Sequence, residues 1–179
     1  EIKENIESVI ITFGGDDSRN MTVKVLKLLV DNYPELTKNV IIGKGFQNTN
    51  VLEKLKDNNT KLIYYPNAEG MKNIMLESDI AISAGGQTLY ELARVGVPAI
   101  AVAVADNQMN NANGWQQVGF IDYAGWWEDK DVFENIHRSI IRVRDSATRE
   151  KRYQRGKKVI DGKGAQLIVD ILLNTEGNR

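Results

Sequence analysis

The chain has 179 residues, a formal net charge of −1 and no cysteine. A near-neutral chain has no basic field to hold a nucleic-acid backbone, and the absence of cysteine excludes disulfides and thiolate metal ligands. The longest apolar run, residues 98–105, is far shorter than the roughly 20 residues of a membrane span, so we expect a soluble cytoplasmic protein without one.

Six short apolar runs, rich in β-branched residues, alternate along the chain with segments of helical period. Because each run is almost continuously hydrophobic, it is typical of a strand covered on both faces. The alternation predicts an α/β fold, with a Rossmann-like parallel sheet of about six strands and helices on both faces. The predicted strands are residues 8–13, 40–43, 61–65, 79–83, 99–104 and 120–124.

The pattern changes after residue 125. Residues 126–159 predict two charged helices, and residues 164–173 predict a closing helix. We expect residues 1–179 to form a single domain. The chain begins with Glu rather than Met, and its first predicted strand starts within eight residues, which suggests a fragment of a longer protein.

Ligands of an open parallel sheet bind beyond the carboxyl ends of its strands, where helices begin. After the first strand, Gly14 and Gly15 allow a backbone to approach an anion closely, and the following helix dipole favours negative charge. An ordinary tight turn explains the glycines equally well, with Asp17 or Ser18 capping the helix. Two adjacent acids are too few to predict a metal site, and we predict none.

The fourth predicted strand is followed by Gly85, Gly86, Gln87 and Thr88, at which a helix starts. Glu91 lies one turn into that helix, on the same face as Thr88. Such a carboxylate is well placed to accept hydrogen bonds from ribose hydroxyls beside a bound anion. The alternative is a solvated Glu that the helix dipole favours.

Two other strand ends carry polar or aromatic side chains. Of the eleven residues 107–117, seven are Asn or Gln. Asn is a poor helix former, but amides both donate and accept hydrogen bonds and so suit sugar hydroxyls. Tyr64 and Tyr65 lie at the end of the third predicted strand, where they either cup a flat base or cover the sheet edge. The single His137 falls in a charged helix away from every strand end, so we predict no catalytic residue.

Four segments, at residues 11–22, 78–102, 106–108 and 161–172, together resemble the carboxy-terminal domain of GT-B-type nucleotide-sugar enzymes. The resemblance covers essentially the whole chain. It is strongest to the SpsG/PseG type of UDP-sugar hydrolase, because of the closing sequence DGKGA, and weaker to the peptidoglycan transferase MurG.

The resemblance implies the carboxy-terminal half of a two-domain enzyme of surface polysaccharide biosynthesis, of the UDP-2,4-diacetamido-2,4,6-trideoxy-sugar hydrolase type. Its partners would be a UDP-sugar and a preceding domain, with no cofactor. The diphosphate would contact the two glycine turns, Glu91 the ribose and residues 63–65 the uracil, while amides of residues 107–111 would reach the sugar and phosphate. The implied UDP-sugar site is Gly14, Gly15, Ile63, Tyr64, Tyr65, Gly85, Gly86, Gln87, Thr88, Glu91, Asn107, Gln108 and Asn111.

In that family a glycine-flanked His of the preceding domain activates the attacking water, and no such segment occurs here. The first loop also departs from the family pattern GGSDP, with Asp16 for Ser and Ser18 for Pro. A GT-B glycosyltransferase is one alternative. A second is a non-catalytic interaction module in which Trp126 and Trp127 mediate a homo-oligomer or bind a partner protein.

Overall fold

The computed structural model describes residues 2–176, and its centre is one six-stranded sheet. The strand order is β3-β2-β1-β4-β5-β6, and every neighbouring pair is parallel. This confirms the predicted Rossmann-like architecture. The strands are β1 (Ser8–Thr12), β2 (Thr37–Ile42), β3 (Thr60–Tyr64), β4 (Ile80–Ala84), β5 (Ala99–Ala103) and β6 (Ile121–Trp126).

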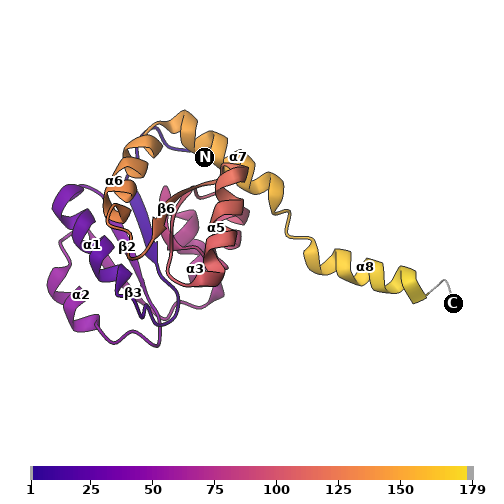
Figure 1. The fold of residues 1–179 in the computed structure, drawn as a ribbon, viewed down its shortest axis with the longest axis horizontal. Coiled ribbons are helices and arrows are strands. Elements are labelled where there is room, and N and C mark those ends of the chain that lie inside the picture. Colours follow the sequence, from indigo (N-terminus) through magenta and orange to yellow (C-terminus); the bar gives the residue numbers. More distant parts are fainter. Residues whose placement is uncertain (1, 177–179) are drawn as a thin grey trace.

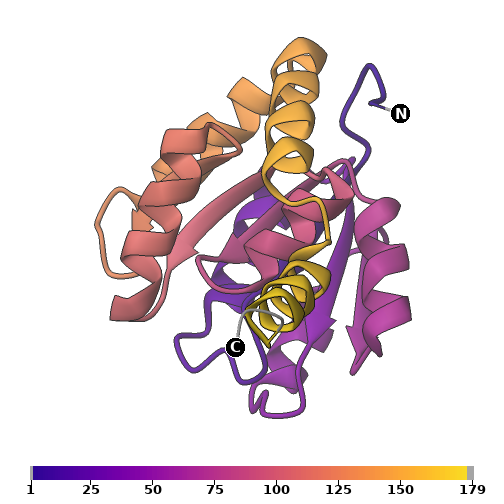
Figure 2. The same cartoon turned by 90° about the vertical axis from the view of Figure 1, so that its right-hand side faces the viewer.

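Helices cover both faces of the sheet (Figure 1). One face packs against α1, α2 and α6, and the other against α3, α4 and α5, the face toward the viewer in Figure 2. The helices are α1 (Met21–Asn32), α2 (Thr49–Leu55), α3 (Ala68–Leu76), α4 (Thr88–Val95), α5 (Asp106–Val118), α6 (Val132–Val143), α7 (Ser146–Val159) and α8 (Gly164–Glu176).

Burial of the strands follows their position in the sheet. Every residue of the central strands β1 and β4 is buried, whereas β3, at the edge, has none that is fully buried. The two central strands are covered by helices on both faces, so almost any polar side chain there would lose its water. This is why their sequences, SVIIT and IAISA, are nearly continuous in hydrophobicity.

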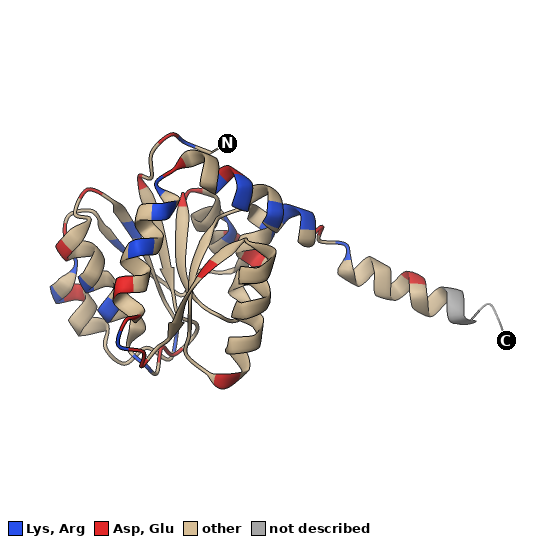
Figure 3. Cartoon of the chain, turned by 45° about the horizontal axis from the view of Figure 1, so that its top comes forward, with Lys and Arg blue, Asp and Glu red and all other residues tan. Residues whose placement is uncertain are grey.

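The closing helix α8 projects away from the body of the domain (Figure 1). Its aliphatic side chains face solvent, with Leu167 60% and Leu173 64% exposed. In Figure 3 Lys and Arg are concentrated along α7, whereas α8 is mostly uncharged. The described helices include none long and apolar enough to cross a membrane.

One buried cation joins the two ends of the domain. Arg149 of α7 is 1% exposed, and its guanidinium donates to the carbonyl oxygens of Val143 and Arg144 at 2.6 and 2.8 Å. It also donates to the carbonyl oxygens of Lys3 and Glu4 at 2.6 and 3.0 Å. The segment before β1 is thereby held against the turn between α6 and α7.

We predict that Arg149→Ala lowers the free energy of unfolding by about 3 kcal/mol, because buried carbonyl groups then lose a charged donor. Urea unfolding followed by circular dichroism measures the change. Arg138→Ala is the matched control, since Arg138 is exposed and its one ion pair within residues 2–176 is with Glu134 at 3.0 Å. That control should cost less than about 0.5 kcal/mol, and equal losses in the two variants would contradict the prediction.

Candidate nucleotide-sugar site

The sheet order separates two loops at its carboxyl edge. β1 lies between β2 and β4, and the loops that follow β1 and β4 lead to α1 and α4 on opposite faces. Between two such loops an open α/β sheet has a crevice that binds ligands. The structure therefore brings Gly14–Gly15 and Gly85–Gly86 to neighbouring strand ends, as the sequence predicts.

The turn between β4 and α4 offers unused hydrogen-bond donors. Gly85 extends the strand by donating its N–H to the carbonyl oxygen of Val102 at 3.0 Å. The backbone N–H groups of Gly86, Gln87 and Thr88 then have no hydrogen-bond partner within residues 2–176, and no side chain caps α4. Three such N–H groups at the positive end of a helix have the geometry and polarity that suit an anion.

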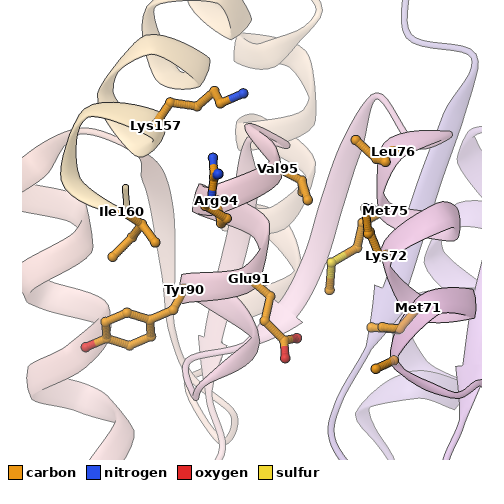
Figure 4. A pocket seen from close by; sticks show the side chains of 11 residues that line it. Met71, Lys72, Met75, Leu76, Tyr90, Glu91, Arg94, Val95, Lys157 and Ile160 are labelled. Atoms are coloured by element: carbon orange, nitrogen blue, oxygen red, sulfur yellow. The ribbon is translucent and has the colours of Figure 1, made fainter. Parts of the chain in front are cut away.

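Glu91 is exposed and lines a groove of about 610 Å³ between α3 and α4. Figure 4 shows its side chain extending from α4 into the space that faces Met71 of α3, whereas Arg94 and Lys157 lie at the other end of the groove. The buried face of α4 consists of Leu89, Leu92 and Ala93. Because Glu91 follows Thr88 by three residues, its carboxylate lies one helical turn from the free N–H groups.

The loop after β1 is organised differently, because its helix is capped by its own carboxylate. Asp17, which is 7% exposed, accepts hydrogen bonds from the N–H groups of Met21 at 2.9 Å and Thr22 at 2.8 Å. Burial raises the pKa of the Asp17 carboxyl, although the backbone N–H of Thr22 favours its charged form. Of the two cap candidates in the sequence, Asp17 therefore fills this role, and these N–H groups at the start of α1 are occupied.

The two glycines of this first loop have different surroundings. Gly14 adopts a φ of 84°, a conformation that other residues rarely take. The carbonyl oxygen of Gly15 accepts from the N–H of Gly45 at 2.9 Å, and a Cβ atom on Gly43 would overlap that same oxygen. Close packing against the carbonyl group of Gly15 therefore accounts for the glycine at position 43, in the loop after β2.

Two amide side chains of α5 face the turn between β4 and α4. Gln108 accepts from the N–H of Val104 at 3.1 Å, and its side chain lies against Gly85. Asn111 donates to the carbonyl oxygens of Gly85 and Gly86. Asn107, at the start of α5, is exposed.

The residues predicted near uracil lie farther along the sheet. Ile63 packs against the core, Tyr64 donates to Glu53 at 2.8 Å, and Tyr65 is 52% exposed with a φ of 51°. None of these three residues lines the groove that contains Glu91. The wall of the groove opposite Glu91 is formed by Ala68 and other residues of α3. No motif in the sequence marked this wall, because its residues are ordinary helix residues.

The remaining candidates are engaged elsewhere in the domain. The ring of His137 lies 2.8 Å from the hydroxyl of Tyr33. Because Tyr33 follows the end of α1, this contact lies toward the amino edge of the sheet. The ring of Trp127 lies beneath the guanidinium of Arg19, whose central carbon is 4.6 Å from the centre of the ring. The backbone N–H of Trp126 donates to Asp129 at 2.7 Å.

We predict that Asp17→Ala lowers the free energy of unfolding by about 2 kcal/mol, because α1 loses its cap and Ala is strained at a positive φ. Asp17→Asn should cost less, since Asn tolerates that conformation and keeps an acceptor. The exposed Asp16→Ala is the control and should change stability by less than about 0.5 kcal/mol in the same urea titration. A loss in Asp16→Ala as large as in Asp17→Ala would contradict the assignment.

Comparison with known proteins places this geometry among related chains. The sequence profile described as "Glycosyltransferase family 28 C-terminal domain" matches residues 9–169. The chain is 23% identical over 174 residues to the spore coat polysaccharide biosynthesis protein SpsG of Bacillus subtilis, which covers 96% of this chain and 51% of SpsG. This match confirms the predicted resemblance at low identity.

Two further matches extend the comparison. The chain is 29% identical over 137 residues to the pseudaminic acid cytidylyltransferase and UDP-2,4-diacetamido-2,4,6-trideoxy-beta-L-altropyranose hydrolase of Helicobacter pylori, covering 74% of this chain and 24% of that protein. The crystal structure of MurG from Acinetobacter baumannii shares the fold, with a TM-score of 0.75 and 18% identity over 97% of this chain and 54% of MurG. The chain thus spans about half the length of SpsG and of MurG.

Proposed function

The chain belongs to the glycosyltransferase family 28 C-terminal domains, and from this membership we propose that it binds the UDP part of a nucleotide sugar. The observation that carries the proposal is the pairing of three free backbone N–H groups with a carboxylate one helical turn away. The N–H groups of residues 86–88 suit a diphosphate, and Glu91 suits the two hydroxyls of a ribose attached to it.

The groove beside Glu91 supports the same ligand. Its walls are mostly apolar, with Met71 and Met75 from α3 and Val95 from α4. A flat base extending from the ribose would bury its faces between such walls while its polar edge reaches the backbone at the start of α3. We therefore propose the start of α3, at Ala68, as the base site, beside the Ile63–Tyr65 segment that precedes it in the chain.

We further propose that the intact enzyme is a two-domain UDP-sugar hydrolase of the SpsG/PseG type. The hydrolase named in the Helicobacter pylori relative and the closing DGKGA sequence support this assignment. Within the described residues, His137 contacts the buried Tyr33 at the end of α1, toward the amino edge of the sheet, so it is not positioned to activate water at the carboxyl edge. The group that does so would come from a preceding domain, and this domain alone would bind UDP without turnover.

We predict that Glu91→Gln weakens UDP binding about tenfold in isothermal titration calorimetry, because a charge-assisted hydrogen bond to the ribose becomes a neutral one. The loss should be smaller with 2′-deoxy-UDP, which lacks one of the hydroxyls. The control is Glu134→Gln on the opposite face of the sheet, which should bind like the unmodified domain. Absence of binding at millimolar UDP, or equal losses for both nucleotides, would count against the proposed site.

Hydrolysis and transfer are separated by an assay of the full-length protein. A hydrolase releases UDP from a UDP-sugar with no acceptor present, and the released sugar carries an oxygen from water. Quantifying the UDP and the free sugar released without acceptor, by chromatography with mass spectrometry, measures this directly. UDP release that requires an added acceptor would instead favour the glycosyltransferase alternative.

A further inference from the structure

Asn111 of α5 lies against the turn that supplies the free N–H groups. Its side-chain Nδ2 donates to the carbonyl oxygen of Gly85 at 2.7 Å and to that of Gly86 at 3.3 Å. Its Oδ1 accepts from the hydroxyl of Tyr90 at 2.9 Å. Both ends of this amide are therefore used within the domain, although the sequence resemblance implied a contact between Asn111 and the ligand.

We propose that Asn111 is a positioning residue, which sets the direction of the N–H groups that hold the diphosphate and does not itself touch the ligand. In a planar trans peptide, the C=O of one residue points opposite to the N–H of the next. Holding the carbonyl of Gly85 toward α5 therefore turns the N–H of Gly86 away from α5. Holding the carbonyl of Gly86 does the same for the N–H of Gln87.

The turn between β4 and α4 needs the two hydrogen bonds from Asn111 because it contains two glycines. A Cβ atom on Gly85 would meet Gln108 at 3.3 Å and Ala112 at 3.4 Å, so close packing against α5 favours glycine there. Gly85 and Gly86 are consequently the residues with the greatest conformational freedom in the unbound turn. A hydrogen bond to each of their carbonyl groups removes part of that freedom before ligand arrives, which is preorganisation.

The amide of Asn111 is itself anchored in the core. The ring of Tyr90 packs edge-on against Trp115 with centroids 5.2 Å apart, and Trp115 is 4% exposed. Because the Tyr90 hydroxyl donates to Oδ1, the amide of Asn111 has its NH₂ group facing the two carbonyl oxygens. Rotation of the amide would break all of these contacts, so its orientation is determined by the surrounding groups.

This inference rests on the proposed function, and affinities for UDP and uridine test it together. In Asn111→Ala we expect UDP affinity to fall about tenfold, while affinity for uridine, which has no phosphate, changes less than about twofold. Tyr90→Phe, which removes one hydroxyl, should show the same selectivity with a smaller loss. Asn113→Ala, at an exposed position of the same helix, is the control and should change neither affinity. Equal losses for UDP and uridine, or no loss for UDP, would overturn the inference.

A second readout needs no ligand. In Asn111→Ala the ¹H–¹⁵N heteronuclear NOE of the Gly86 and Gln87 amides should fall, because the turn becomes mobile, whereas Asn113→Ala should leave it unchanged. Unchanged values in a folded Asn111→Ala would overturn the positioning role whether or not UDP binds. If the NOE values fall but the unmodified domain does not bind UDP, the proposed function is wrong, whereas the positioning of the turn by Asn111 is supported.

Asn111→Asp provides a variant of nearly identical shape. At neutral pH its carboxylate faces two carbonyl oxygens with no hydrogen to donate, so UDP affinity should fall at least as far as in Asn111→Ala. Below the pKa of the introduced acid, one O–H donor returns and part of the affinity relative to the unmodified domain should be regained. A constant ratio from pH 4 to 7 would contradict a role that depends on hydrogen-bond donation.

Discussion

The pairing of β1 with β2 on one side and β4 on the other determines where the rest of the site lies. It forces the connections after β1 and β4 onto opposite faces of the sheet, so their loops diverge at the carboxyl edge. The two loops are alike in sequence but differ in electrostatics. The start of α1 already holds the carboxylate of Asp17, whereas the start of α4 keeps its N–H groups free. The fold therefore offers two similar turns, of which only the one before α4 keeps free N–H groups for the anion that we propose.

Most of the fold could be predicted from the sequence, because a parallel sheet covered on both faces requires nearly continuous apolar strands. The five strongest runs coincide with β1 to β5 within a few residues at either end. The sixth predicted strand had the weakest apolar run, and β6 ends two residues later than predicted. Its pairing with β5 shifts register at Ala124, and the next residue, Gly125, has a φ of 123°. A break of this kind interrupts the regular pattern on which strand prediction depends.

The candidate site could be predicted only in outline. Glycines, a Glu at helical spacing and an amide-rich helix indicate a polar ligand, because those signals are local in sequence. Hydrogen bonds between distant elements leave no such signal. Asn111 contacts a turn 25 residues away, whereas the sequence resemblance implied that it contacts the ligand. The sequence also could not decide whether Asp17 or Ser18 caps α1, because that depends on the conformation of the folded loop. Nor did it indicate that α3 forms the wall that faces Glu91.

The four carbonyl contacts of Arg149 have a mechanical consequence. The guanidinium joins residues 3–4 to residues 143–144, which lie near opposite ends of the sequence. A force applied to the start of the chain therefore reaches the corner between α6 and α7 before it reaches the hydrogen bonds of β1. The two bonds to Lys3 and Glu4 would share such a load, and the guanidinium would pass it to α7 and to the carbonyl groups of Val143 and Arg144. Motion of the segment before β1 would accordingly be transmitted first to α7, whose Lys157 lines the same groove as Glu91.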